Sequence, residues 1–344
     1  MFQFFFIPFS LLYAFGIALR NFFYDNGIFR STKLTIPVMS VGNISVGGTG
    51  KTPHVEYLAR LCQKLGKKVA VVSRGYKRKT KGMFVVSDGE TIFGNASDCG
   101  DEPLQLARAI SGTVIIVDEN RVRAAEYAQK NFFVEVIILD DGFQHRKIER
   151  SMDIVIIDAQ QQDSMILPAG RRREPWRSLK RSDAVILSRW LPSDIAKENE
   201  TKVRQYSSTV LKTKFEPKHL RNFRTNETLD LKMLVNEPVV AFCGIGSPRS
   251  FQEIIIAAKA NVQAFLAYAD HHYYSERDCE EIIRRVTETH SKYVVTTEKD
   301  AARLTEAIYA NHTARMPLFV LEIDTQILEG EEILHSALNK LFTK

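Results

Sequence analysis

The stretch Gly42-Asn43-Ile44-Ser45-Val46-Gly47-Gly48-Thr49-Gly50-Lys51-Thr52-Pro53 follows an apolar run over Thr35–Val41 and precedes a helix-like pattern over Pro53–Leu65. A strand, a glycine-rich turn, Gly-Lys-Thr and a helix in this order are the context that a phosphate-binding loop requires. Because glycine lacks a Cβ, backbone N–H groups of the turn can converge on phosphate oxygens, and the helix N-terminus adds unpaired donors. The stretch therefore predicts a nucleoside triphosphate site in an α/β fold of the P-loop NTPase type.

The residues of this loop have separate predicted roles. Lys51 would reach the β- and γ-phosphates, and the Thr52 hydroxyl would ligate Mg²⁺. The motif has glycine at its first position, where this chain has a serine. A glycine-rich turn that only caps a helix is the alternative, but the flanking strand and helix argue against it. The predicted nucleotide-binding residues are Ser45, Val46, Gly47, Gly48, Thr49, Gly50, Lys51 and Thr52.

Composition narrows the class of protein. The 344 residues suffice for more than one domain, and 44% hydrophobic with 26% charged residues exclude wholesale disorder. A formal net charge of +6 suits an anionic substrate or membrane surface but does not indicate nucleic-acid binding, so we expect no nucleic-acid partner. The four cysteines form no Cys-x-x-Cys pair, which favours a reducing compartment. Nothing in the sequence implies an obligate protein partner.

The N-terminal segment is apolar and rich in phenylalanine. A secretory signal needs a positive region before the apolar stretch, and residues 1–19 carry no charge. A spanning helix needs about 20 apolar residues, and Pro8 interrupts this segment. Aromatic segments flanked by cations, here Arg20 and Arg30, are typical of helices at the lipid headgroup boundary, although a helix packed on the protein core is the alternative. We predict a membrane-contacting helix over residues 1–30 on the cytoplasmic side.

Short runs rich in valine and isoleucine, separated by helical patterns, predict a mostly parallel sheet flanked by helices. In the first part of the chain these runs are residues 68–73, 114–117, 136–139, 154–158 and 184–188. We predict a P-loop domain over residues 31–205, a β-rich connection over 206–236 and a smaller C-terminal α/β domain over 237–344.

Charged residues follow several of these runs, at the sheet edge where ligands gather in α/β proteins. Asp140 and Asp141 end one strand, and such an acidic strand end downstream of a phosphate loop indicates a Mg²⁺ site. Arg74 opens a basic loop after another strand, and contact with an anion or plain solvation both fit it. The arginines of residues 171–173 suit an anion, or they form a solvated charge run.

The segment Gly100-Asp101-Glu102-Pro103 opens a predicted helix. An acidic first turn with proline is good chemistry for a helix start, so a structural role is one interpretation. A carboxylate at this place can also accept a proton from an attacking hydroxyl. Both interpretations stay open on these residues alone. Farther along, Asp270-His271-His272 follows a predicted strand. These residues could be metal ligands, a pair of proton-accepting groups or part of a turn.

Seven motifs occur in order: GNISVGGTGKTP, SRGY, GDEP, DDGFQH, LPAGxxRE, ADHHxY and TTEKDA. From Phe22 to Arg303 they resemble the tetraacyldisaccharide 4′-kinase family, the lipid A 4′-kinases. The resemblance implies ATP- and Mg²⁺-dependent phosphorylation of the 4′-hydroxyl of an acylated glucosamine disaccharide 1-phosphate. The product would be the bis-phosphorylated lipid A precursor. It also implies a location at the cytoplasmic face of the inner membrane of a Gram-negative bacterium.

The resemblance further implies roles for single residues. Asp101 would assist deprotonation of the acceptor hydroxyl with His271 as its partner, and Lys51 would be the catalytic cation. The implied metal ligands are Thr52, Asp140 and Asp141. The implied substrate contacts are Arg74, Gln144, His145, Arg173 and Glu174.

The main alternative is a GTPase-type or regulatory P-loop NTPase at the membrane. Thr297-Glu298-Lys299-Asp300 superficially resembles a guanine-recognition motif, but its lysine stands one place late. A second alternative is a non-enzymatic membrane protein that holds ATP as a structural ligand. In that case there is no need for ionisable groups at Asp101, Asp140, Asp141 and His271.

Overall fold

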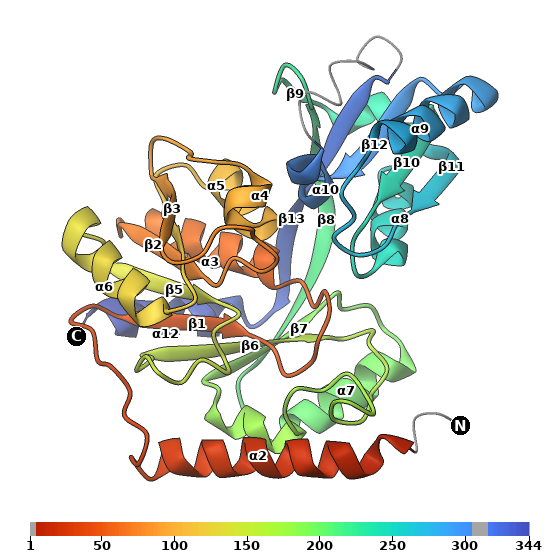
Figure 1. The fold of residues 1–344 in the computed structure, drawn as a ribbon. Helices are drawn as coiled ribbons and strands as arrows, with labels where there is room; N and C mark the ends of the chain where they lie inside the picture. Colours follow the sequence, from red (N-terminus) through yellow and green to blue (C-terminus); the bar gives the residue numbers. More distant parts are fainter. Residues whose placement is uncertain (1–4, 305–315, 344) are drawn as a thin grey trace. The chain divides into compact units, whose positions relative to one another are not determined.

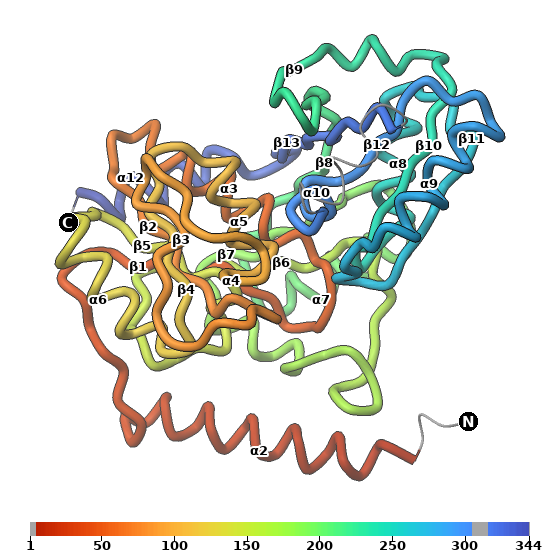
Figure 2. Tube along the Cα trace, turned by 45° about the horizontal axis from the view of Figure 1, so that its top comes forward, coloured from red at the N-terminus to blue at the C-terminus, as the bar shows by residue number. Residues whose placement is uncertain are grey.

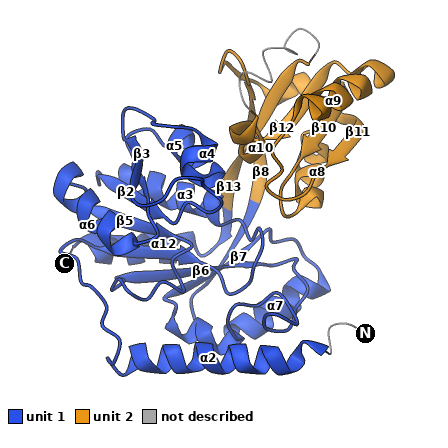
Figure 3. Ribbon diagram, in the orientation of Figure 1, with its two compact units in different colours: residues 1–214, 327–344 blue, residues 215–326 orange. Residues whose placement is uncertain are grey.

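The computed structural model describes residues 5–304 and 316–343 and contains two compact units (Figures 1 and 3). Unit 1 comprises Met1–Lys214 and Ile327–Lys344, and unit 2 comprises Phe215–Gln326. The terminal stretch from Ile327 therefore belongs to unit 1, although the sequence analysis assigns it to the C-terminal domain. The predicted limits of independently folding domains stay a prediction. Residues 1–4, 305–315 and 344 of those predicted domains lie outside the described residues.

A mostly parallel sheet forms the centre of unit 1 (Figure 1). In spatial order its strands are β7 (Ala184–Ser188), β6 (Met152–Asp158), β1 (Val38–Gly42), β5 (Val136–Asp140), β2 (Val69–Ser73), β4 (Val114–Val117) and β3 (Phe84–Asp88). Only the pairing of β3 with β4 is antiparallel among these neighbours. Every residue of β1, β2, β4, β5, β6 and β7 is buried, as in strands covered on both faces. The predicted α/β fold is confirmed.

Helices cover this sheet and complete unit 1. They are α3 (Lys51–Lys64), α4 (Ala96–Cys99), α5 (Asp101–Ala109), α6 (Arg121–Phe132), α7 (Asp194–Arg204), α12 (Glu331–Phe342) and the 3-10 helix η1 (Trp176–Arg181). The small side chains of Ala124 and Ala128 in α6 pack with Val72 of β2 and Ile116 of β4. Small residues on the helix thus allow close approach to branched residues on the strands.

Unit 2 is a smaller α/β unit. Its sheet runs β11 (Asn261–Ala267), β10 (Pro238–Cys243), β12 (Tyr293–Thr297), β13 (Leu318–Glu329) and β8 (Val210–Asn222), with β9 (Thr228–Leu229) antiparallel to β8. Its helices are α8 (Pro248–Ala257), α9 (Glu276–Thr289), α10 (Glu298–Arg303) and the 3-10 helix η2 (Leu231–Leu234). Val239 and Ala241 of β10 lie in one core cluster and Val240 and Phe242 in another, following the two-residue period of a strand.

The N-terminal segment forms helix α2 (Ile7–Asp25), which runs along one side of unit 1 (Figure 2). By length and composition it is apolar enough to cross a membrane, with a mean hydropathy of 1.2 over its best window. Only Ser10 is buried in this helix. Large apolar side chains are exposed instead, among them Leu12 at 69% and Phe15 at 68%. The predicted apolar N-terminal helix is therefore confirmed.

Candidate active site

The phosphate loop joins the end of β1 at Gly42 to the start of α3 at Lys51. Gly47 has φ +110° and Gly50, the residue before the helix, has φ +86°. Residues with a side chain rarely adopt such positive φ angles, so the backbone conformation favours glycine at both positions. The strand, turn and helix predicted around these residues are confirmed.

The end of β7 supports the loop from behind. Ser188 Oγ donates to the carbonyl of Thr49 at 2.7 Å, and Arg189 Nη2 donates to the carbonyl of Gly48 at 2.8 Å. Arg189 also pairs with Asp158 at the end of β6. These bonds take up two loop carbonyls, which would otherwise repel an anion bound by N–H groups of the loop. Sequence reasoning missed Arg189; its only signal is its place directly after a buried strand.

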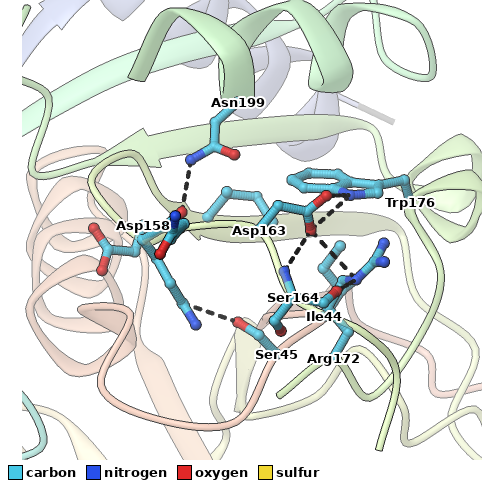
Figure 4. A pocket seen from close by; sticks show the side chains of 11 residues that line it. Ile44, Ser45, Asp158, Asp163, Ser164, Arg172, Trp176 and Asn199 are labelled. Carbon is cyan, nitrogen blue, oxygen red and sulfur yellow. Dashed lines mark hydrogen bonds and ion pairs between the residues drawn. The ribbon is translucent and has the colours of Figure 1, made fainter. Parts of the chain in front are cut away.

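A small pocket lies beside the N-terminal part of the loop (Figure 4). Its lining residues include Ile44, Ser45, Asp163, Arg172 and Trp176. Its volume is about 30 Å³, whereas a single water needs at least roughly 10–15 Å³. The space has room for about two or three waters, which is far less than a nucleotide needs.

Asp140 is the last residue of β5, and its side chain is buried. Ser73 Oγ, at the end of β2, donates to Asp140 Oδ2 at 3.0 Å, while Oδ1 is buried and has no hydrogen-bond partner among the described residues. Burial raises the pKa of Asp140 to about 6, and the nearby Glu102 carboxylate adds to this rise while Lys51 opposes it. A buried carboxylate oxygen without a partner is costly, and a bound cation would remove that cost.

Asp141 follows in the left-handed region, with φ +50°. Its carboxylate lies 3.5 Å from Lys51 Nζ and 2.8 Å from Arg173 Nη1, and Arg121 donates to its carbonyl at 2.8 Å. Burial alone would raise its pKa, but Lys51 and Arg173 outweigh burial and lower the pKa of Asp141 to about 2. Asp141 is therefore ionised throughout the physiological range and fixes two cations at the mouth of the loop.

The structure thus brings Lys51, Asp140, Asp141 and Arg173 together, and the roles predicted for them stay predictions. It adds Arg121 and Ser73, which sequence reasoning missed. Arg74 lies close enough to Arg121 to lower the pKa of that guanidinium, as does Arg173, after the larger effect of burial. These cations surround the carboxyl end of the sheet, where anionic ligands bind in α/β proteins.

Asp101 is the first residue of α5 and is buried, with 6% exposed. The preceding Gly100 has φ +94°, and a Cβ there would lie 3.2 Å from the carbonyl oxygen of Tyr76. The GDEP turn therefore packs against the SRGY loop, and a side chain at residue 100 would be crowded there as well as strained in its backbone. The predicted helix does begin at Asp101, and both the structural and the catalytic role of its carboxylate stay predictions.

Gln144 and Glu174 belong to one buried network in unit 1. Glu174 is fully buried and accepts hydrogen bonds from Gln144 Nε2 at 3.1 Å, Arg181 Nη1 at 3.1 Å and Asn21 Nδ2 at 3.0 Å. These contacts join α2 and η1 to the loop after β5. The carboxylate of Glu174 is thus engaged by protein donors. The contact of Gln144 and Glu174 with substrate stays a prediction.

His145 lies in the same loop as Gln144. Burial, followed by the charge of Arg121, lowers the pKa of His145 to about 3. Its imidazole is therefore neutral at physiological pH. A neutral ring can donate or accept one hydrogen bond but supplies no positive charge to a phosphate.

His271 lies in unit 2, in the turn after β11, with φ +64°. Its backbone N–H donates to the carbonyl of Gly244 at 3.0 Å. Arg303 Nη1 donates to the same carbonyl at 2.8 Å, and Asp300 accepts from the Gly244 N–H at 2.9 Å. The turn that carries His271 is thus held by a buried ion pair, and the predicted pairing of His271 with Asp101 stays a prediction.

The TTEKDA motif supplies Asp300, the acid of that ion pair, and Arg303 lies just after the motif. Asp300 is fully buried and also accepts from Tyr274 Oη at 2.8 Å and Thr297 Oγ1 at 2.5 Å. A carboxylate engaged by these donors within unit 2 has a structural function. The partial likeness of this segment to a guanine-recognition motif therefore lends no weight to the GTPase alternative.

The family model described as "Tetraacyldisaccharide-1-P 4'-kinase" matches residues 2–343. A tetraacyldisaccharide 4′-kinase of Chlorobaculum parvum is 38% identical over 338 residues, covering 96% of this chain and 92% of that protein. One from Porphyromonas gingivalis is 39% identical over 313 residues, covering 86% and 85%.

A solved structure of the same family is also similar to this chain. The crystal structure of the "apo" form of LpxK from Aquifex aeolicus in complex with ATP has a TM-score of 0.80 and 32% sequence identity, covering 99% of this chain and 100% of that chain. The family predicted from the seven motifs is confirmed. The chain belongs to the tetraacyldisaccharide-1-phosphate 4′-kinase family.

Proposed function

We propose that this chain transfers the γ-phosphoryl group of ATP to the 4′-hydroxyl of a tetraacylated glucosamine disaccharide 1-phosphate, giving the bis-phosphorylated lipid A precursor. The observation that carries the proposal is the arrangement around Lys51, which begins α3 and whose Nζ lies 3.5 Å from the carboxylate of Asp141, directly after β5. A phosphate loop facing an acidic strand end is the arrangement that phosphoryl-transfer enzymes use. The Aquifex aeolicus relative, whose structure contains ATP, supports the choice of nucleotide.

The residues of the loop would hold and orient the triphosphate. The N–H groups of Gly48 and Gly50 and the ammonium group of Lys51 would bind its oxygens. Thr52, Asp140 and Asp141 offer the hard oxygen ligands that suit Mg²⁺, and the unpartnered Oδ1 of Asp140 fits such a cation. When bound, Mg²⁺ neutralises charge on the phosphate oxygens. The chain itself contributes positioning and fixed charge.

Proton removal from the acceptor hydroxyl is assigned to Asp101, with His271 tuning or relaying the proton. Asp101 is buried at a helix N-terminus, where the helix dipole stabilises its ionised form. An ionised carboxylate in hydrogen-bond reach of a hydroxyl serves as a general base.

We assign α2 to the membrane surface at the cytoplasmic face of the inner membrane. Ser10 is bonded to the Ile166 carbonyl at 2.9 Å and to the Ala169 N–H at 3.0 Å, while Asn21 donates to Glu174. These two anchors, about 16 Å apart along the helix, attach both halves of α2 to unit 1. A helix held in this way lies along the bilayer surface with its exposed aromatic side chains in the lipid.

The membrane assignment predicts that Phe15→Ser weakens binding to vesicles of phosphatidylethanolamine and phosphatidylglycerol about tenfold, because an exposed phenyl ring would leave the lipid. Flotation measures the bound fraction. Phe133→Ser is the matched control, since Phe133 is 78% exposed but lies at the end of α6. Equal flotation of both variants would contradict the assignment.

The catalytic proposal is tested by measuring ATP consumption with and without the disaccharide lipid, with GTP as competitor. We expect consumption only when the lipid is present, formation of a phosphorylated lipid product and no competition by GTP. ATP hydrolysis that is indifferent to the lipid, or a clear preference for GTP, would overturn the proposal.

The raised pKa of Asp140 predicts an acid limit to activity. As the pH falls through about 6, Asp140 takes up a proton and loses its charge for Mg²⁺, so kcat/KM for ATP should fall about tenfold per pH unit. Unfolding is not the cause: a carboxyl whose pKa is higher in the folded than in the unfolded state stabilises the fold increasingly as the pH falls from 6 toward its ordinary value of 3.8.

Ser73→Ala is the matched variant for this pH dependence. The hydrogen bond from Ser73 lowers the pKa of Asp140, so its removal should move the acid limb to higher pH. A pH profile of kcat/KM measures the shift. A limb that stays in place in Ser73→Ala, or activity that is constant down to pH 5, would show that Asp140 does not control it.

A further inference from the structure

The loop after β6 contains three consecutive arginines that differ in their partners. Arg172 lies 3.5 Å from Asp163, and Arg173 forms its ion pair with Asp141. Arg171 is exposed, and within residues 5–304 and 316–343 its side chain forms no hydrogen bond or ion pair. One cation of this basic loop is therefore uncommitted to protein groups.

The backbone of Arg171 is fixed on both sides. The Val46 N–H of the phosphate loop donates to its carbonyl at 2.7 Å, and its own N–H donates to Ser164 Oγ at 3.0 Å. The backbones of Ser45 and Arg172 form an antiparallel β-bridge in the same place. The two loops are therefore joined by main-chain bonds, and Arg171 starts from a defined position beside residues 45–47.

The side chain of Arg171 lies on the phosphate loop itself. Its Nη2 atom is 3.0 Å from the position that a Cβ would take on Gly47. A side chain at residue 47 would displace the guanidinium. Glycine at this position therefore leaves space for the arginine and also permits the positive φ of the backbone. The guanidinium thus rests on the part of the loop that precedes Lys51 by four residues.

Nearby acids do not neutralise this guanidinium. Burial raises the pKa of Asp158, and Arg189 and then Arg171 oppose that rise, but the carboxylate is already held by two nitrogens of Arg189. A planar guanidinium with free donors beside a loop of N–H groups is suited to phosphate oxygens, because it can bind two of them at once.

We propose that Arg171 supplies a second side-chain cation to the triphosphate in the loop, acting from within the same chain beside Lys51. The inference rests on the proposed function, because it takes the loop to be the ATP site. Arginines delivered in cis to phosphate loops stabilise charge on the transferring group. The competing source of phosphate oxygens is a lipid headgroup, and the experiment separates the two.

The experiment is calorimetric titration of the full-length protein with a non-hydrolysable ATP analogue and Mg²⁺, in detergent without lipid. Arg171→Gln should weaken binding about tenfold, the effect of one charge-assisted hydrogen bond, and Arg171→Lys should recover part of it. Arg172→Gln removes an equal charge from the neighbouring position and should change affinity within about twofold. Equal melting temperatures of the variants exclude misfolding.

The outcomes distinguish this inference from the proposed function. Unchanged affinity in Arg171→Gln together with a large loss in Lys51→Ala overturns the inference and leaves the ATP site in place. Unchanged affinity in Lys51→Ala overturns the ATP site itself. If Arg171→Gln reduces binding to vesicles containing phosphatidylglycerol but not to the nucleotide, Arg171 serves a lipid phosphate and the inference is wrong. An equal loss in Arg172→Gln points to net charge alone and also overturns it.

Discussion

Lys51→Ala is expected to lower phosphoryl transfer at least about 10³-fold, to the limit of detection. Its ammonium group is the side-chain cation at the start of α3, only 14% exposed and 3.5 Å from Asp141 Oδ1. Phosphoryl transfer depends on charge neutralisation and positioning, and alanine supplies neither. The loss should also raise the pKa of both Asp140 and Asp141, because Lys51 lowers both. Transfer of labelled phosphate from ATP to the lipid measures the effect.

Lys64→Ala is the matched control, because Lys64 lies in the last turn of the same helix and is exposed. It removes the same charge and the same side chain from α3 at the end away from the loop. We expect nearly unchanged transfer in this variant. A Lys51→Ala protein that keeps more than about a tenth of the activity would be incompatible with the assigned role of the lysine, since one lost charged contact already accounts for a tenfold change.

The phosphate loop and the acidic strand end could be predicted from sequence because their signals are local. Gly47, Gly50 and Lys51 lie in one turn between a strand and a helix, and Asp140 and Asp141 directly follow an apolar run. Their meeting follows from the parallel sheet, in which β1 and β5 are neighbours. Once the sheet is predicted, the carboxyl ends of its strands must share an edge.

The supports of the site could not be predicted in this way. Ser73 and Arg121 reach the acidic pair from segments far away in sequence, and Arg189 reaches Gly48 across 141 positions. No local pattern distinguishes these residues from other polar residues at strand ends. Glu174 shows the converse case: its motif identifies an important residue, yet only the structure shows that it is buried and joins α2 to the loop after β5.

The same limit applies to the organisation of the chain. A change from apolar to polar residues suggests a second unit, but the return of the chain to unit 1 within β13 depends on contacts between distant segments. For the N-terminal helix, in contrast, composition alone is informative. Its phenylalanines indicate an apolar surface, whereas the anchors at Ser10 and Asn21 that support its orientation are single polar residues within it.

Asp101→Asn is expected to lower kcat about 10²–10⁴-fold while leaving the affinity for ATP nearly unchanged. Asparagine keeps the size of the side chain and can still begin a helix, so α5 should form normally. It cannot take the proton of the acceptor hydroxyl, which is the step assigned to Asp101. Single-turnover transfer measures the chemical step, and titration with a non-hydrolysable ATP analogue measures binding.

The variant separates the two interpretations of GDEP because each predicts a different loss. If Asp101 only starts the helix, Asp101→Ala should lower the melting temperature and Asp101→Asn should restore both stability and kcat. If Asp101 is the base, Asp101→Asn restores stability but not kcat. Glu102→Gln is the neighbouring control: Glu102 raises the pKa of Asp140, so its neutralisation should move the acid limb of the pH profile to lower pH. Full activity of Asp101→Asn would leave the helix start as the whole function of this carboxylate.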